Sequence, residues 1–244
     1  MDIQCTPAEE KIFRLIAATG EQLGFPCYVI GGSVRDKLLG RKTKDADIVC
    51  VGDGTELAKR VAKKLGEKVP VIVYKNFGTA QVKYADMELE LVGARKESYR
   101  SHSRKPDVDT GTLEDDQLRR DFTINALAVS LNKTDYGSLS DPFGGLEDLK
   151  KKIIRTPLNP VRTFSDDPLR MMRAIRFASQ LHFTIVFGTF NAIKENAERI
   201  RIVSQERITD ELNKILLSNQ PSTGLDLLYQ SDLLPIIFPQ MVAL

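Results

Sequence analysis

The chain has 244 residues, 42% of them hydrophobic and 28% charged, and its formal net charge is +2 at pH 7. These proportions are those of a folded globular protein and exclude a largely disordered chain. No apolar run approaches the roughly 20 residues that span a bilayer, and the first residues lack the features of a secretory signal, so we expect a cytoplasmic protein without a membrane partner. With a net charge this close to zero, nucleic-acid binding would require locally concentrated basic residues.

Residues 1–92 combine predicted helices with short strands. Thr6, Pro7 and Glu9 form the start signal of a helix, with Thr6 as its cap, and the helical spacing of apolar residues continues to Gly24. Further along, the patterns predict helices at 34–39 and 55–65 and strands at 27–30, 46–51, 69–74, 79–84 and 87–92. The two turn residues between the last two strands indicate an antiparallel hairpin.

The second half of the chain changes from mixed to helical patterns. The polar stretch 95–116 has no hydrophobic period, so we expect a mobile loop there, and the apolar residues 127–131 are expected to rejoin the sheet. Later helices are expected at 167–181, 188–199, 204–217 and 222–233. We therefore predict an α+β domain over residues 1–156 and an all-α region, a neck and the start of a body, over residues 157–244.

The last residues, 233–244, are strongly apolar. An apolar end of this kind would meet water. We therefore expect the natural protein to continue past Leu244, and we expect this segment to promote self-association when it is exposed.

Two aspartates indicate a possible site for metal ions. Asp45 and Asp47 are two residues apart on a predicted strand, so both carboxylates point to one face, where they can share divalent cations. Glu90, on another predicted strand, would add a third oxygen ligand if the two strands are neighbours. Two hard cations about 3.5–4 Å apart activate an attacking hydroxyl group and stabilise leaving pyrophosphate in phosphoryl transfer. An isolated Asp-x-Asp pair is more often a solvated strand end. The neighbouring sequence therefore decides between a strand end and a metal site.

That context is a glycine pair between a predicted strand and a predicted helix. Bare backbone N–H groups at Gly31 and Gly32, together with the start of the helix, favour a bound phosphate. Arg35 follows on the first turn of the helix. A glycine pair alone indicates a tight turn, but a phosphate cradle followed closely by paired carboxylates favours a nucleotide site. The full G-x-G-x-x-G pattern and a long helix are missing, which excludes a dinucleotide-binding motif.

Arg119 and Arg120 precede an apolar segment at 122–126. Guanidinium groups pair with phosphate in a fork geometry, so the two arginines could clamp a triphosphate. The alternative is a surface ion pair with Asp115 or Asp116.

The helix predicted from Asp167 has an apolar stripe and an arginine face. The stripe follows helical spacing and comprises Met171, Ala174, Ile175 and Ala178. The arginine face comprises Arg170, Arg173 and Arg176. Leu169 and Phe177 share this face, which indicates that it is partly covered, and covered arginines need anionic or hydrogen-bonding partners. Asp167 lies within a helical turn of Arg170, so an acceptor and a fork of donors stand together and can read a base edge.

Taken together and in order, these segments resemble the class II tRNA nucleotidyltransferases and the closely similar bacterial poly(A) polymerases. The matching residues are Gly31-Gly32-Ser33-Val34-Arg35-Asp36 with Asp45-Ala46-Asp47, Arg119 to Ala126, Asp141 to Leu149, Asp166-Asp167-Pro168-Leu169-Arg170 continuing to Arg176-Phe177, and Glu206-Arg207 with Glu211. The resemblance covers most of the chain. One departure is Asp166, a shorter carboxylate than the glutamate usual in the family, at a position that supports an ion pair.

The resemblance implies a DNA polymerase beta-like nucleotidyltransferase head with a mixed sheet, followed by a helical neck and body. It implies that Asp45 and Asp47 bind two Mg²⁺ ions and that Gly32, Arg35 and Arg120 hold CTP or ATP. It further implies that Asp167, with the three arginines of its helix, completes the nucleotide site, and that the acceptor is the 3′ end of tRNA.

Base selection has a physical basis in this arrangement. Cytosine and adenine each present an amino donor beside a ring-nitrogen acceptor, which complements an Asp167 acceptor beside Arg170 donors. Uracil and guanine mismatch this pair, and each such contact discriminates by about 1–3 kcal/mol.

Three alternatives share these motifs. A poly(A) polymerase has all of them, and so does an enzyme that adds only C or only A. A non-catalytic nucleotide-binding or RNA-binding module is a different class, and the intact pair of Asp45 and Asp47 argues against it.

Overall fold

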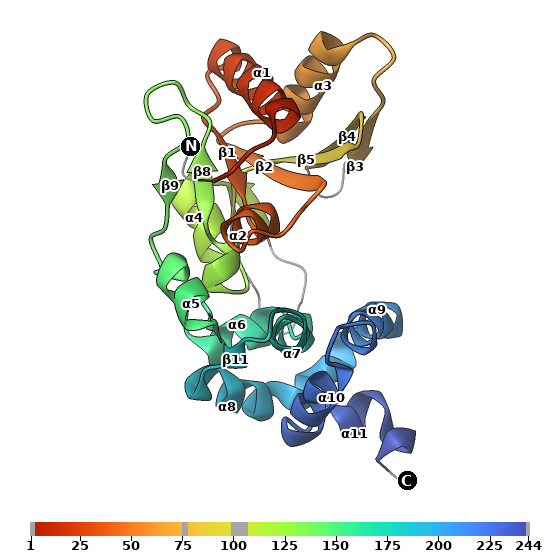
Figure 1. Ribbon diagram of the computed structural model, residues 1–244. Coiled ribbons are helices and arrows are strands. Elements are labelled where there is room, and N and C mark those ends of the chain that lie inside the picture. The colour runs from red at the N-terminus through yellow and green to blue at the C-terminus, as the bar shows by residue number, and fades with distance from the viewer. Residues whose placement is uncertain (1–2, 75–77, 99–106, 243–244) are drawn as a thin grey trace. The chain divides into compact units, whose positions relative to one another are not determined.

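The computed structural model describes residues 3–74, 78–98 and 107–242, which form two compact units (Figure 1). The first unit contains the described residues up to Ser98, Asp107–Arg120 and Ile124–Gly145, and the second contains Asp121–Thr123 and the residues from Leu146 on. The first unit has α1 (Pro7–Leu23), β1 (Cys27–Ile30), α2 (Gly32–Leu38), β2 (Asp45–Cys50), α3 (Gly54–Leu65), β3 (Val71–Tyr74), β4 (Thr79–Tyr84), β5 (Met87–Gly93), β6 (Arg95–Ser98), β7 (Asp107–Thr110), α4 (Leu113–Leu118), β8 (Ala128–Ser130) and β9 (Leu139–Ser140).

Seven strands of the first unit form one mixed sheet in the order β3-β4-β5-β2-β1-β8-β9. β2 and β5 are parallel neighbours, whereas the other neighbouring strands of this sheet are antiparallel. The hairpin predicted between β4 and β5 is confirmed, and Ala85 in its turn has a φ of 52°. The mixed sheet, followed by a helical region, confirms the predicted α+β class.

The two faces of this sheet are covered by different helices. α1 and α3 pack against each other over one face (Figure 1). α1 begins at the predicted capping box, in which the Glu9 N–H donates to the Thr6 hydroxyl at 3.2 Å and the Thr6 N–H donates to the Glu9 carboxylate at 2.7 Å. On the other face, Leu113 of α4 packs against a cluster of buried side chains, comprising Ile30, Val49, Val92, Ala94 and Ala128. α4 is therefore held against the face to which alternate residues of β2 and β5 point.

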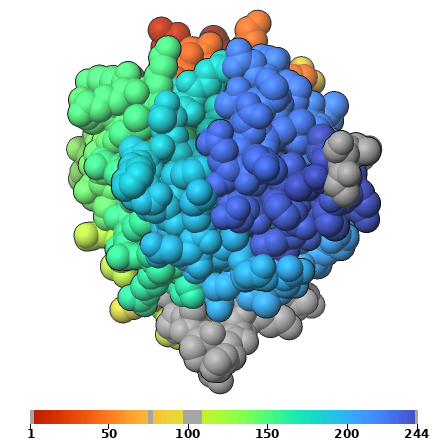
Figure 2. All heavy atoms as spheres, turned by 90° about the horizontal axis from the view of Figure 1, so that it is seen from below, coloured from red at the N-terminus to blue at the C-terminus, as the bar shows by residue number. Residues whose placement is uncertain are grey.

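The second unit is mainly helical. It contains α5 (Gly145–Lys151, which begins at the last residue of the first unit), β10 (Ile153–Ile154), α6 (Pro160–Asp166), α7 (Leu169–Leu181), β11 (Thr184–Ile185), α8 (Phe187–Asn196), the 3₁₀ helix η3 (Ala197–Ile202), α9 (Gln205–Leu216), α10 (Pro221–Gln230), α11 (Leu234–Ile237) and η4 (Pro239–Met241). α7 packs against α9 and α10, and Figure 2 shows the surface that the chain forms from α8 onward, in cyan to blue. No helix in the described part of the chain is both long and apolar enough to cross a membrane.

The prediction of a mobile loop over 95–116 is wrong for the residues that the structure describes. β6 pairs with β7 in an antiparallel ladder, and α4 begins soon after it. α4 starts with a capping box of its own, formed by Thr112 and Asp115, and this local signal was present in the sequence. The part of the predicted loop at 99–106 lies outside the described residues.

The division between the two units differs from the predicted boundary at 156. The first unit ends at Gly145, so α5 and β10 belong to the second unit. β10 and β11 form a two-residue parallel ladder that pairs Ile153 with Thr184. Strands this short have no periodicity to detect, which explains why the sequence predicted only helices here.

The apolar segment 233–242 is partly covered within the second unit. Leu233 and Leu234 are buried, so the expectation that the whole segment meets water is wrong for these two residues. Phe238, Met241 and Val242 remain partly exposed. Self-association through this segment stays a prediction.

The packing of α3 on β5 can be tested at Gly54, the first residue of α3. A Cβ atom there would lie 2.5 Å from the carbonyl carbon of Val92 and 2.6 Å from the amide nitrogen of Gly93, both in the backbone of β5. Gly54→Ala should therefore lower the free energy of unfolding by about 1–3 kcal/mol, measured by urea denaturation. Gly188→Ala is the matched control, because no atom lies within 4 Å of its Cβ position. The control should be neutral or slightly stabilising, and equal stability of the two variants would contradict the packing.

Candidate functional site

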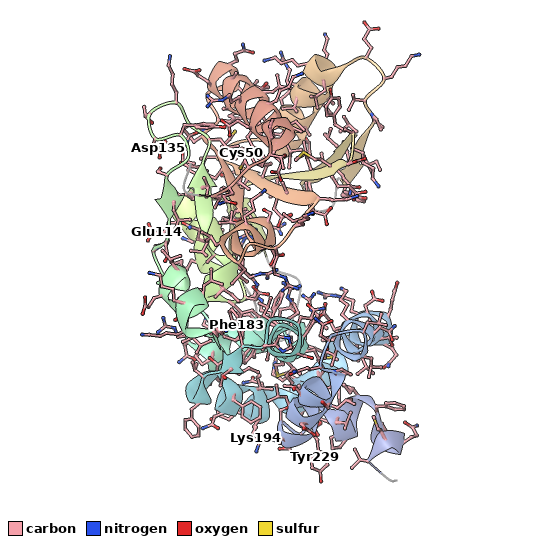
Figure 3. All side chains as sticks on the ribbon, in the orientation of Figure 1. Cys50, Glu114, Asp135, Phe183, Lys194 and Tyr229 are labelled. Atoms are coloured by element: carbon pink, nitrogen blue, oxygen red, sulfur yellow. The ribbon has the colours of Figure 1, made fainter. Side chains whose placement is uncertain are left out.

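Two aspartates lie on the face of the sheet that α4 covers. Along β2, Ala46, Ile48 and Cys50 are buried toward α1 and α3, and Cys50 can be found in Figure 3. Asp45, Asp47 and Val49 alternate with them and therefore share the opposite face. Val49 belongs to the cluster under α4. This face of β2 thus changes from apolar to acidic toward the start of the strand, and the two carboxylates start from one face, as strand alternation predicts.

The parallel pairing of β2 with β5 brings Glu90 next to Asp47. The two strands are therefore neighbours, which is the condition under which the sequence made Glu90 a candidate ligand. Partial burial and the neighbouring Asp47 carboxylate raise the pKa of Glu90 above its ordinary value of 4.5, against the opposing effect of Arg95 and Arg120. Negative charge that accumulates in this way is stabilised by a bound cation.

The aspartate pair suits a hard divalent cation but does not form a complete cage. Carboxylate oxygens are the ligands that Mg²⁺ prefers, and proteins often supply only one or two of them. Within the described ranges, no group of three or more His, Cys, Asp or Glu side chains is arranged to hold a metal ion. Glu90 therefore does not join Asp45 and Asp47 in a three-residue group in this structure. A cation at the pair would take its other ligands from water and from the phosphates of a substrate.

Gly31, at the end of β1, is a point of close approach. Its φ of 82° lies in the region that favours glycine. A Cβ atom at this position would lie 2.7 Å from Nη1 of Arg120 and 3.1 Å from Oδ2 of Asp47. The Gly31 N–H donates to the carbonyl oxygen of Leu127 at 3.1 Å. Gly31 therefore leaves space between the Arg120 guanidinium group and the Asp47 carboxylate. Its N–H group is already bonded to Leu127 and is not the bare donor that the sequence suggests.

α2 begins at Gly32 and has only seven residues. Arg35, in its interior, is buried, and its guanidinium group donates to both carboxylate oxygens of Asp36 at 3.0 Å and to the side-chain oxygen of Asn125 at 2.7 Å. Its Nη2 lies 3.5 Å from the Cβ position of Gly32. Arg35 is therefore held in a fixed position beside the first turn of α2, and its charge is balanced by Asp36.

Arg119 and Arg120 share one carboxylate. Both guanidinium groups pair with Asp116 of α4, whose side chain is fully buried. Arg120 donates from Nε and from Nη2 to Oδ2 of Asp116, each at 3.1 Å, and Arg119 donates to Oδ1. Of the two predicted alternatives, the ion pair with Asp116 exists, but it is buried and not on the surface. Nη1 of Arg120 lies on the other side of the guanidinium group, at Gly31, so the pair does not exclude a role with phosphate.

The arginine face of α7 is partly covered, as the sequence predicts. The carboxylate of Asp121 accepts from Nε of Arg173 at 2.7 Å and lies 2.6 Å from Nη2 of the same guanidinium group. This carboxylate raises the pKa of Arg173. Arg176 lies 2.7 Å from a carboxylate oxygen of Glu211 on α9, and its guanidinium group stacks 4.3 Å from the ring centroid of Phe177. Both arginines are therefore engaged by acidic side chains of the second unit.

Asp167 and Arg170 differ from these two arginines. Asp167 lies between α6 and α7, where Oδ1 accepts from the Leu169 N–H at 3.3 Å. Its Oδ2 is 3.8 Å from Nη2 of Arg207, a long ion pair with a partly exposed carboxylate. The Arg170 side chain makes no hydrogen bond or ion pair with the rest of the chain that the structure describes. An acceptor and a fork of donors with spare capacity thus lie at the start of α7.

Three residues that hold this machinery were not singled out as functional from the sequence. Asp116 was named only as an alternative partner, and its spacing of four from Arg120 is a helical signal that could have placed it. Asp121 follows the arginine pair directly, but its partner Arg173 is 52 residues away. Asn125 and Arg35 are 90 residues apart, and no local pattern connects them.

Known proteins share both units of this chain. A family model described as the poly A polymerase head domain matches residues 27–155. A second, described as the probable RNA and SrmB-binding site of polymerase A, matches residues 182–244.

Individual relatives agree with these family matches. The A-adding tRNA nucleotidyltransferase of Aquifex aeolicus is 43% identical over 191 residues, and the CCA-adding enzyme of Ligilactobacillus salivarius is 40% identical over 227 residues. These alignments cover 78% and 92% of this chain but only 23% and 54% of the two relatives. The structure of the Thermotoga maritima CCA-adding enzyme in complex with tRNA matches with a TM-score of 0.83 at 34% identity, covering 96% of this chain and 53% of that one.

The closeness of Asp47 and Glu90 predicts a pH-dependent effect of Asp47→Asn. The raised pKa of Glu90 means that its contribution to stability is fully present below about pH 4.5 and is lost as the pH rises through the folded value. Removing the Asp47 charge should lower that pKa and raise the melting temperature at pH 7–8 in the presence of a chelator. The gain should shrink as the pH falls toward 4.5.

Melting curves from pH 4.5 to 8, with an NMR titration of the Glu90 carboxyl group, measure both effects. Asp45→Asn is the matched control, because Asp45 is not among the groups that shift the pKa of Glu90. A pKa of Glu90 that is unchanged in Asp47→Asn would contradict the assigned contact.

Proposed function

This chain belongs to the family of tRNA nucleotidyltransferases and poly(A) polymerases, and from this premise we propose that it transfers CMP and AMP from CTP and ATP to the 3′ end of tRNA. The proposal includes a cytoplasmic location. The chain spans about half the length of the CCA-adding relative, so activity, substrates and RNA partner all belong to the proposal.

The observation that carries this proposal is the convergence at Gly31. Arg120 supplies a guanidinium group and Asp47 supplies a carboxylate on two sides of a point where there is no side chain. A nucleoside triphosphate needs both, because its phosphate oxygens pair with arginine and its metal ions pair with carboxylates. Neither a sensor of uncharged ligands nor a purely structural unit needs this combination.

The proposed reaction is a phosphoryl transfer. The oxygen of the tRNA 3′-hydroxyl group bonds to the α-phosphorus of the nucleotide, the bond from that phosphorus to the oxygen bridging to the β-phosphate breaks, and pyrophosphate leaves while the hydroxyl proton goes to water. Asp45 and Asp47 would bind Mg²⁺, which supplies activation of the attacking hydroxyl group and charge compensation on pyrophosphate. Arg120 would hold the phosphate chain, and Arg35, fixed beside Gly32 by Asp36 and Asn125, would support the site there.

We assign base selection to the start of α7. In this proposal Asp167 accepts from the exocyclic amino group of cytosine or adenine, and Arg170 donates to the adjacent ring nitrogen. Arg173 and Arg176 were expected to complete the nucleotide site, but their acidic partners favour a different role. They tie α7 to Asp121 and to α9 and thereby fix the helix from which Arg170 projects.

Incorporation assays test this proposal against its alternatives. We expect incorporation of CTP and ATP on tRNAs that end before, between and after the C and A additions, and no extension of a generic oligo(A) primer. Use of only one nucleotide on tRNA would support the alternative of a C-only or A-only enzyme. Extension of oligo(A) with ATP alone would support a poly(A) polymerase, and the absence of any incorporation would support a non-catalytic module.

In the same assay, Asp45→Asn or Asp47→Asn should abolish single-turnover incorporation while the protein stays folded. Each variant neutralises one of the paired carboxylates, which removes several kcal/mol of transition-state stabilisation. Asp86→Asn is the matched control, because Asp86 is an exposed acid in the β4–β5 turn of the same sheet. Near-normal turnover in Asp45→Asn or in Asp47→Asn would contradict the assignment of these two residues to the metal site.

Asp167→Ala should weaken discrimination between bases and leave nucleotide binding largely intact. The acceptor for the amino group is lost, whereas the phosphate contacts from the first unit remain. The preference for CTP and ATP over UTP and GTP should fall by about 1–3 kcal/mol, measured by competition among the four nucleotides. Asp210→Ala removes an exposed carboxylate from α9 and should keep the preference. Unchanged selectivity in an active Asp167→Ala protein would mean that the base is read elsewhere.

A further inference from the structure

A buried carboxylate lies behind the arginine that reaches Gly31. The Asp116 side chain is 0% exposed, and it is shared between Arg119 and Arg120, whose side chains are 17% and 16% exposed. Each of its two oxygens accepts from one guanidinium group. Burial alone would raise the pKa of Asp116, but the two arginines lower it. The carboxylate is therefore ionised at neutral pH, and the three groups together carry a surplus of one positive charge.

Asp116 has a fixed position because α4 is anchored on both sides of it. Leu113 packs into the apolar cluster of the sheet. The buried side chain of Gln117 donates from Nε2 to the carbonyl oxygen of Ala126 at 2.7 Å and to that of Ser140 at 3.3 Å. Figure 3 labels Glu114, the exposed residue between Leu113 and Asp116. The carboxylate is thus part of the rigid framework of the first unit.

The bonds to Asp116 leave one side of the Arg120 guanidinium group uncommitted. A guanidinium group has five donor positions in a rigid plane. Nε and Nη2 face Asp116, whereas Nη1 makes only a long contact of 3.5 Å to the carbonyl oxygen of Asn125 and lies at the Cβ position of Gly31. The donors on this second side remain available to an anion in the described structure.

We propose that Asp116 is a positioning residue that holds the guanidinium group of Arg120 beside Gly31, ready to bind the phosphate chain of the nucleotide. This inference rests on the proposed function. Arg120 has a second carboxylate within reach, because Asp47 flanks the same point at Gly31. Without Asp116, the attraction of opposite charges would draw Arg120 onto Asp47. The nucleotide would then lose a phosphate ligand, and the Asp47 carboxylate would be drawn into an ion pair with Arg120 instead of facing a metal ion. Asp116 prevents both.

A double-mutant cycle on the whole chain tests this inference through equilibrium nucleotide binding, measured by calorimetry with CTP and by displacement of labelled CTP with CMP. Asp116→Asn should weaken CTP binding by about tenfold, the usual value of a charge-assisted hydrogen bond. In an Arg120→Ala background, the same substitution should have little further effect. CMP, which lacks the β- and γ-phosphates, should be affected much less than CTP. Glu114→Gln, which removes an exposed carboxylate from the same turn of α4, should bind CTP as the parent protein does.

The outcomes are distinct. If the parent protein binds no CTP, the proposed function fails. If the parent binds CTP but the effects of Asp116→Asn and Arg120→Ala add independently, or CMP weakens as much as CTP, Asp116 is only structural and this inference is overturned. If Asp116→Asn does not fold, Arg120→Lys decides, because lysine keeps the charge but cannot face Asp116 and Gly31 together. It should bind CTP as poorly as Arg120→Ala does, and parent-like binding would overturn the inference.

Discussion

At Gly31 the backbone takes a φ of 82°, and the guanidinium group of Arg120 and the carboxylate of Asp47 lie where a Cβ atom would project. Any other residue would be strained in this conformation and would also collide with Arg120. The close approach depends on three neighbours of Gly31: β2 carries Asp47, α4 carries the carboxylate that holds Arg120, and α2 begins directly afterwards. The mixed sheet fixes all three, because β1 pairs with β2 and α4 packs on the cluster formed by both strands. The candidate site is thus a consequence of sheet packing on its second face.

In the second unit, arginine side chains are mostly paired with acidic side chains and hold helices in place. Two partly buried arginines of α7 are each paired with an acid, Arg173 with Asp121 and Arg176 with Glu211. An unpaired guanidinium group in such surroundings would be costly, whereas a paired one orients the helix that carries it. Phe177 adds to this by packing edge-on against Phe122 at 5.8 Å and by lying under Arg176. Within α7, Arg170 at the start of the helix has no such acidic partner among the described residues. The arginine at the start of α7 therefore differs from the two that follow it, which are held by acidic side chains.

Local signals in the sequence were sufficient for most elements of the first unit. The capping box at Thr6 and the β-branched run at Cys27–Ile30 specify their elements with little help from the rest of the chain. The register that brings Glu90 beside Asp47 is a tertiary property, and the sequence could state it only as a condition. Asp116 shows most clearly which part of the site the sequence does not predict. Its spacing from Arg120 indicates a helical ion pair, but its burial depends on where Leu113 and Gln117 of α4 pack, which no local pattern specifies. The hydrogen bond between Arg35 and Asn125 is still harder to predict from the sequence, because only the folded structure brings together segments 90 residues apart.

The central claim is that a nucleotide with its metal ions binds where β1 ends and β2 begins, around Gly31 and the aspartate pair. The most direct test is paramagnetic broadening of backbone amide signals by Mn²⁺ in the presence of CTP. The account predicts the strongest broadening at Gly31, Gly32 and the residues around Asp47, and its loss when Asp45 and Asp47 are both replaced by Asn. Broadening centred elsewhere in the chain, or broadening that persists in the double variant, would contradict the account.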